Sequence, residues 1–472
     1  MLRKTEEIQV TPDNPFTEDK LQRRRPVENM AALISTITQP FVLAVDGRWG
    51  TGKTVFAHML RAQLQSRGHP CIYFNAWEND FVADPMVAFL GEIDAAIKSK
   101  ALKLPPKAAA RKKWRSARQK GEVVLRAAAP LAVRILSQGI IDAPRISEAL
   151  EKLAGEALDG YPSQKKQMES FRESLQGFVD AVGESAENQR LPVVLIIDEL
   201  DRCRPTFALE LLEQVKHLFS VRGMVFVLAI DLQQLSSMAK AVYGPEMDGR
   251  GYLRRFIDLT YELPQPDLAA YCQHVIDDLE LPTFFSPRQN GVEDAEHLLS
   301  TVTGMAEVFQ LSLRALEQCL TEINIVLRTT PPSHLSLVLL TSFLITLRAW
   351  NADLYHQFAE GKIGAGQLLS GIPALANSPY FQGRDHDTYM TACLYAFSGM
   401  QGEAEARIEE RKATMDDSDR TDHERRLAQS ELESLVPLTK HHMTTGLRLR
   451  ALRTVLSRIQ AATEYVVSVP EE

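Results

Sequence analysis

A glycine-rich stretch of eight residues limits the choice of fold more than any other part of this chain. Residues 47–54 read GRWGTGKT and fit the pattern G-x-x-x-x-G-K-[ST]. The stretch follows the apolar run FVLAVDG at 41–47 and precedes the helix-period segment KTVFAHMLRAQLQ. A strand, a glycine-rich turn and a helix in this order are typical of a phosphate-binding loop. The sequence therefore predicts a P-loop nucleoside-triphosphate domain.

The predicted loop supplies the groups that a triphosphate needs. Its glycines let backbone N–H groups and the start of the next helix point at the phosphates. Lys53 adds a positive charge at the β- and γ-oxygens, and the Thr54 hydroxyl is a ligand for Mg²⁺. No guanine signature such as NKxD occurs, which favours ATP over GTP. The predicted nucleotide-binding residues of this region are Gly47, Arg48, Trp49, Gly50, Thr51, Gly52, Lys53, Thr54 and Val55.

A second apolar run ends in carboxylates. Residues 193–201 read VVLIIDELD. A P-loop needs a carboxylate at the end of a neighbouring strand to hold Mg²⁺ opposite the Thr54 hydroxyl, and Asp198 is predicted to supply it. Glu199 is predicted to act as the general base on the attacking water. A further run ends at Asp231, which is expected to sense the γ-phosphate, to cap the next helix, or both.

The apolar runs predict the fold class. They are FVLAVDG at 41, CIYFNAW at 71, VVLIID at 193 and MVFVLAID at 224, and they alternate with helical stretches. This alternation predicts a doubly wound α/β core with a parallel sheet. The expected divisions are residues 1–95 and 191–265 for the two halves of the core, 96–190 for a helical insertion, 266–330 for a helical lid and 331–472 for a C-terminal helical region.

Composition excludes several classes of protein. The net charge of −8 argues against a surface given over entirely to nucleic acid. Five scattered cysteines without CxxC spacing suggest neither a disulfide framework nor a zinc site, which fits a reducing cytosol. The charged start MLRKTEEIQV lacks the apolar region of a signal peptide, and no uninterrupted apolar stretch is long enough to span a membrane.

Five motifs in this order resemble the KAP family of P-loop NTPases. Besides GRWGTGKT they are FNAWEND at 74–80, IIDELDRCRP at 196–205, and AID at 229–231 with GYLRRFIDLTYELP at 251–264. The resemblance covers about residues 10–330. It implies the branch with an additional strand between the two phosphate-binding strands and a catalytic glutamate, with Phe74 to Trp77 as the end of that strand. Family members often insert membrane spans between FNAW and DELD, but here Arg126, Pro130 and Arg134 interrupt the apolar segment 123–141.

The resemblance also suggests roles for arginines. Arg255 aligns with a basic position of the family's YLxK-like motif, which implies stabilisation of the transition state, in trans from a neighbouring subunit. Arg254, Arg202 and Arg204 are further candidates, and a surface salt bridge is the alternative for each. Arg314, in LSLRALEQCL, resembles the lid arginine that reports nucleotide to the C-terminal region. Trp77 is expected in the core, and Asn75 as a strand cap.

A basic stretch has three interpretations. Residues 98–120 contain ten lysines and arginines, no acid, and Trp114. The stretch is expected to touch an anionic membrane surface or a protein partner, to bind nucleic acid with Trp114 stacked on a base, or to be merely solvated. The leading hypothesis is a homo-oligomeric Mg-ATPase that acts as a regulatory or assembly switch in the cytoplasm or at the inner membrane face. Bacterial anti-phage defence is implied by the family alone, and the alternative is a nucleic-acid-stimulated motor.

Overall fold

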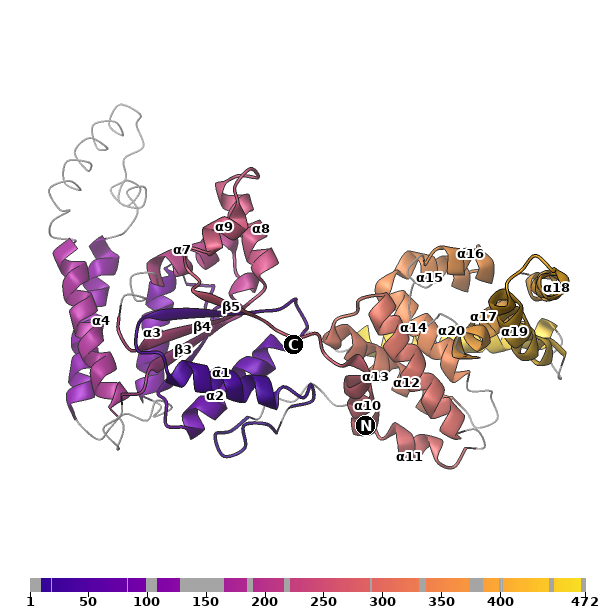
Figure 1. The fold of residues 1–472 in the computed structure, drawn as a ribbon, viewed down its shortest axis with the longest axis horizontal. Coiled ribbons are helices and arrows are strands. Elements are labelled where there is room, and N and C mark those ends of the chain that lie inside the picture. The colour runs from indigo at the N-terminus through magenta and orange to yellow at the C-terminus, as the bar shows by residue number, and fades with distance from the viewer. Residues whose placement is uncertain are drawn as a thin grey trace. The chain divides into compact units, whose positions relative to one another are not determined.

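The structure is a computed structural model of the 472-residue chain. It describes residues 10–17, 19–82, 84–98, 108–127, 165–184, 190–215, 221–288, 291–330, 337–372, 385–398, 400, 402–440 and 445–467. The chain divides between Gln265 and Pro266 into two compact units (Figure 1), and each is described by itself.

The first unit is built on a parallel sheet. Its described residues form five strands in the order β2-β3-β4-β1-β5. The strands are β1 (Phe41–Asp46), β2 (Cys71–Asn75), β3 (Val193–Asp198), β4 (Met224–Ile230) and β5 (Leu259–Glu262). Every neighbouring pair is parallel, so all carboxyl ends meet at one edge. The predicted α/β class with a parallel sheet is confirmed.

Helices surround the sheet in the first unit. They are α1 (Arg24–Ser35), α2 (Lys53–Ser66), α3 (Pro85–Lys98), α4 (Ala108–Ala127), α7 (Pro205–Val215), α8 (Leu232–Tyr243) and α9 (Gly249–Leu253), with the 3₁₀ turn η1 (Leu200–Arg202) after β3. A further helix spans residues 165–183.

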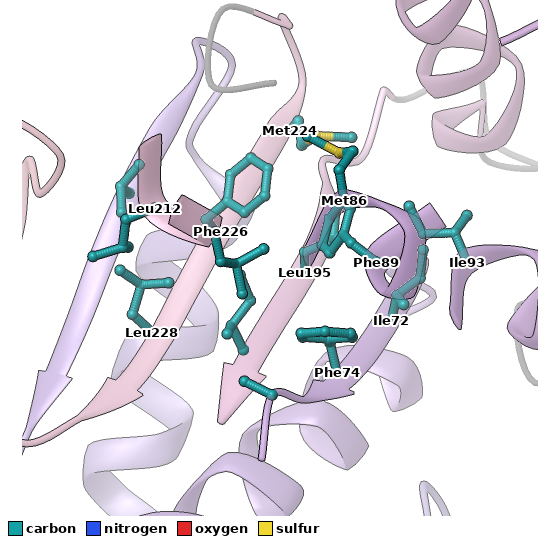
Figure 2. Close-up of a cluster of buried hydrophobic side chains, with 14 of the residues drawn as sticks. Ile72, Phe74, Met86, Phe89, Ile93, Leu195, Leu212, Met224, Phe226 and Leu228 are labelled. Carbon is teal, nitrogen blue, oxygen red and sulfur yellow. The ribbon is translucent and has the colours of Figure 1, made fainter. Parts of the chain in front are cut away.

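Alternate residues of β1 to β4 enter two separate cores. Phe74, Leu195 and Phe226 belong to the core on the side of α3, α4, α7 and α8, which Figure 2 shows in part. Val194 and Val225 belong to the other core, with residues of α1 and α2. Continuous apolar runs suit a sheet that is covered on both faces, because both sets of side chains are then removed from water. The helices therefore cover both faces of the sheet.

The resemblance assigned the additional strand wrongly. The strand between β1 and β3 is β4, whereas β2, which ends at Asn75, lies at the sheet edge beside β3. The expectation that Phe74 to Trp77 ends the inserted strand is therefore corrected. Parallel strands are joined by long crossovers, so the order of strands along the chain does not fix their order in the sheet.

The described part of the insertion is a helical pair. Trp114 of α4 packs against Phe178 of the helix 165–183, with ring centroids 5.1 Å apart. Nearer the C-terminal end of α4, Lys120 donates 2.8 Å to the hydroxyl of Ser174, so the two helices run antiparallel. Most of the interrupted apolar segment 123–141 lies outside the described residues. Among the helices that the structure describes, none has both the length and the apolar character needed to cross a membrane.

The second unit is helical throughout its described residues. It contains α10 (Leu268–Asp278), α11 (Leu281–Phe285), α12 (Gly291–Val308), α13 (Leu313–Thr329), α14 (Val338–Trp350), α15 (Ala352–Ala359), α16 (Ala365–Ser370), α17 (Asp385–Phe397), α18 (Glu403–Asp416), α19 (Asp422–Lys440) and α20 (Thr445–Val467). Two of these helices, α18 and α19, are joined by charged side chains. The buried Glu431 of α19 accepts hydrogen bonds from Arg407 (2.7 Å) and Arg411 (2.6 Å) of α18. These bonds tie two strongly charged helices together.

Candidate functional site

The glycine-rich loop connects β1, an interior strand of the sheet, to α2. It begins where β1 ends, and the N–H of Gly47 donates 3.1 Å to the carbonyl of Ile230 at the end of β4. Gly50 and Gly52 have φ angles of +76° and +81°, which residues with a Cβ adopt only with strain. A Cβ on Gly52 would also lie 2.9 Å from the Leu21 side chain. The backbone therefore turns tightly enough for α2 to begin at Lys53, with the first N–H groups of α2 facing the loop.

Lys53 is held inside this loop. Its side chain is almost fully buried, and Nζ donates to the carbonyl oxygens of Gly47 (2.7 Å) and Arg48 (3.2 Å). An ammonium group held in this way, at the N-terminus of a helix, is a point charge suited to phosphate.

Thr54 and Asp198 are in contact, as a shared metal requires. The Thr54 hydroxyl lies beside the Asp198 carboxylate and lowers the pKa of that carboxyl, and the carboxylate is fully buried. Its Oδ2 accepts 2.8 Å from the Tyr73 hydroxyl, and its Oδ1 accepts 2.8 Å from the N–H of Glu199. Burial raises the pKa of Asp198, while the bonds from Tyr73 and Thr54 act against that rise.

The donor atoms fit Mg²⁺. A hydroxyl and a carboxylate are hard oxygen ligands, and Mg²⁺ is commonly bound by one or two such groups together with phosphates of the substrate. No group of three or more His, Cys, Asp or Glu side chains suited to a metal occurs in the described part of the chain. Thr54 and Asp198 would therefore hold Mg²⁺ jointly with the nucleotide.

Glu199 lies at the carboxyl edge of the sheet in a strained conformation. Its φ of +59° is uncommon for a residue with a Cβ. The carboxylate forms a 2.8 Å ion pair with Arg202 and lies beside the Asn75 side chain. Burial raises the pKa of Glu199, and the nearby Arg202 lowers it. A positioned carboxylate with a raised pKa is suited to take a proton from water.

The segment after β2 differs in part from expectation. Asn75 does cap the turn, since its Oδ1 accepts from the N–H groups of Trp77 (3.1 Å) and Glu78 (3.3 Å). The prediction that Trp77 is a core residue is wrong: its side chain is 54% exposed, because β2 ends at Asn75 and the turn directs Ala76 inward instead. The contact between Asn75 and Glu199 was missed, and the only signal for it was the position of FNAW at a strand end.

Asp231 begins α8. Its side chain accepts from the N–H groups of Gln233 (3.0 Å) and Gln234 (3.1 Å), so the expected helix cap is present. Asp231 follows β4, between the strands that carry the loop and Asp198. A second carboxylate, Asp46 at the end of β1, was not predicted and accepts 2.9 Å from the N–H of Leu232.

The arginine candidates fall into separate places. Arg202 contacts Glu199, whereas Arg204 is paired at 2.9 Å with Asp80 in the turn after β2. Arg254 and Arg255 are exposed and precede β5, whose first residue is level with Leu43 near the start of β1. These two arginines are therefore at the amino edge of the sheet, opposite the loop.

The remaining arginine of interest is in the other unit. Arg314 lies in the first turn of α13, and its predicted contact with nucleotide stays a prediction.

The basic stretch does not expose its tryptophan. Trp114 is 2% exposed, and its indole N–H donates 3.1 Å to Asp94 of α3. Stacking of Trp114 on a nucleic-acid base is therefore excluded, because Trp114 belongs to the apolar stripe that packs α4 on its neighbours. Arg111, Lys112 and Arg115 are exposed on α4.

Comparison with known proteins identifies a family. A family model described as the KAP family P-loop domain matches residues 23–330. Among solved structures, the ORC2 protein of Aeropyrum pernix in ADPNP–ADP complexes is 16% identical, with 94% of this chain and 95% of that chain covered and a TM-score of 0.32. A DNA replication initiation factor is 10% identical, with 92% and 100% covered and a TM-score of 0.27. No curated protein matches the chain.

Proposed function

Because the chain belongs to the KAP family of P-loop domains, we propose that it binds ATP with Mg²⁺ and hydrolyses it to ADP and phosphate. The observation that carries this proposal is the close approach of the Thr54 hydroxyl to the fully buried Asp198 carboxylate, beside the ammonium of Lys53. These three groups converge although they come from two segments far apart in the sequence.

Each residue has a distinct part in the proposed reaction. Lys53 and the N–H groups of the loop bind the β- and γ-phosphates and stabilise the charge that develops during transfer. Thr54 and Asp198 hold Mg²⁺, which neutralises phosphate charge when bound. Glu199 accepts a proton from the water that attacks the γ-phosphorus, and its contacts with Asn75 and Arg202 orient it. Asp231 is proposed to sense the γ-phosphate in addition to capping α8.

Replacing Glu199 by Gln tests the chemistry. Glu199→Gln keeps the size and hydrogen-bonding capacity of the side chain but removes the base, so turnover should be lost while Mg-ATP still binds. Binding is measured by calorimetry and turnover by phosphate release, with Glu210→Gln on the neighbouring α7 as the control. Turnover that persists in Glu199→Gln would exclude Glu199 as the base.

Hydrolysis is proposed to drive a regulatory or assembly switch in a homo-oligomer. The exposed positions of Arg254 and Arg255 at the amino edge support action in trans, because they are remote from the loop of their own chain. Arg314 is proposed to report the nucleotide to the helical unit. A role in bacterial anti-phage defence, acting on a protein partner in the cytoplasm or at the inner membrane face, follows from the family alone.

A second candidate function is a nucleic-acid-stimulated ATPase. The exposed Arg111, Lys112 and Arg115 on α4 favour contact with phosphates of a polyanion. Turnover should then rise on addition of DNA or RNA, and that rise should fall steeply with salt. The same assay is run with anionic liposomes in place of nucleic acid. If DNA, RNA and liposomes all leave the turnover unchanged, this second candidate is rejected.

A further inference from the structure

The turn after β3 carries a buried carboxylate that the proposed reaction does not use. Asp201 lies in η1 and is 1% exposed. Its Oδ2 accepts a 2.5 Å hydrogen bond from the indole N–H of Trp49 and lies 3.7 Å from Nζ of Lys53. One carboxylate oxygen thus contacts two residues of the phosphate-binding loop, which is about 150 residues away in the sequence.

The other oxygen of Asp201 is costly to the fold. Its Oδ1 is buried and accepts no hydrogen bond from any other residue that the structure describes. Burial raises the pKa of Asp201, while the charge of Lys53 and the bond from Trp49 lower it. A buried carboxylate with one unsatisfied oxygen destabilises the protein, so its presence beside the loop calls for a role in the site.

Lys53 can satisfy only a limited number of acceptors. An ammonium group has three N–H donors, and the carbonyls of Gly47 and Arg48 take two of them. The third is available to Asp201 or to a phosphate oxygen. Both acceptors are anionic, so Asp201 competes with the nucleotide for Lys53. The Asp201 carboxylate also repels the phosphates of the nucleotide. The bond from Trp49 offsets this competition, because it stabilises the same carboxylate oxygen from the other side.

We propose that Asp201 and Trp49 together set the affinity of the loop for the phosphates of the nucleotide. Asp201 weakens binding by competing for Lys53, and Trp49 strengthens it by satisfying Asp201. Both are positioning residues that act through Lys53. This inference rests on the proposed function, since it requires phosphates to bind at Lys53.

The two residues should therefore have opposite effects when they are changed. Asp201→Asn removes the charge but keeps an oxygen that can accept from Trp49, so the affinity for Mg-ATP should rise about tenfold. Trp49→Phe removes the donor and strengthens the pull of Asp201 on Lys53, so the affinity should fall severalfold. In the double variant the effect of Trp49→Phe should largely disappear, since the charge through which it acts is gone.

The experiment is calorimetric titration of the full chain with Mg-ATP, with thermal unfolding of each variant as a check of the fold. Trp77→Phe is the matched control, because Trp77 is 54% exposed against 49% for Trp49 and its indole makes no hydrogen bond within the described residues. The control should bind as the wild type does. If Asp201→Asn does not fold, the loss of affinity in the exposed Trp49→Phe alone decides the question.

Three results would overturn the inference. Weaker binding in both single variants, with additive losses in the double variant, would make Asp201 a structural support only. Unchanged affinity in Trp49→Phe would show that the indole bond does not reach the phosphates. A wild-type chain that does not bind Mg-ATP at all would reject the proposed function itself, and this inference with it.

Discussion

Removing the hydroxyl of Tyr73 should show how far the proposed metal ligand Asp198 depends on this neighbour. Tyr73 of β2 donates 2.8 Å to Oδ2 of Asp198, and its ring packs on His58 with centroids 4.5 Å apart. Tyr73→Phe removes the hydrogen bond and keeps the ring. Asp198 then retains the N–H of Glu199 on Oδ1 and the neighbouring Thr54 hydroxyl, but it loses the donor that holds Oδ2.

The size of the effect follows from the charge on the acceptor. A hydrogen bond to a charged group contributes about 1.5–3 kcal/mol, and about 1.4 kcal/mol corresponds to tenfold in an equilibrium constant. If that energy orients Asp198 toward the metal, the Mg²⁺ concentration needed for half-maximal turnover should rise about tenfold to a hundredfold in Tyr73→Phe.

The same substitution should change the pH dependence. Burial raises the pKa of Asp198 and the Tyr73 bond lowers it, so the pKa rises further when the hydroxyl is lost. Since the carboxylate must be deprotonated to bind Mg²⁺, a larger fraction of the protein is inactive at any acidic pH. The acid limb of the turnover profile should therefore move to higher pH.

The assay is phosphate release as a function of Mg²⁺ and pH. Tyr243→Phe is the control, because its hydroxyl also donates to a carboxylate, Glu213 at 2.6 Å, but on α7, outside the proposed site. Thermal unfolding shows whether each variant is folded. A folded Tyr73→Phe protein with wild-type Mg²⁺ dependence and an unmoved acid limb would refute the proposed role of Tyr73.

Two further predictions concern assembly and folding. Arg255→Ala should be inactive alone and regain turnover when mixed with inactive Lys53→Ala, since the second chain supplies the arginine that the first lacks; no recovery in mixtures that do assemble would exclude action in trans. Trp114→Ala should lower the free energy of unfolding by about 3–5 kcal/mol in denaturant titrations, because a fully buried indole is replaced by a cavity, whereas Arg115→Ala on the exposed face should change it little.

The local features of the site could be predicted because each depends only on residues that are adjacent in the sequence. The loop 47–54 needs glycines at positive φ and Lys53 at the start of a helix, and continuous apolar runs mark strands covered on both faces. Tyr73, Asn75 and Asp201 were missed as site residues, because their contacts join segments more than 100 residues apart and depend on the order of strands.

The two misassigned tryptophans show the same limit. Trp114 stands in a run of basic residues, yet Ala110, Trp114 and Ala117 recur at helical spacing and form the buried face of α4. Its charged neighbours cover the other side. Trp77 follows an apolar run but lies one residue past Ala76, where the chain has already turned away from the sheet. Spacing along the element, rather than the character of the neighbours, decides burial in both cases.

The charges at the carboxyl edge explain why a cation belongs to the proposed reaction. Burial raises the pKa of Asp46, Asp198, Glu199 and Asp201, which means that the fold resists ionising each of them. Lys53 is a buried cation beside them, and a triphosphate adds several more negative charges. Mg²⁺ held by Thr54 and Asp198 would reduce this excess of negative charge. A site with this excess of negative charge should bind the nucleotide and the cation together. A nucleotide without the cation would be repelled by the ionised carboxylates, and Lys53 alone cannot neutralise that repulsion.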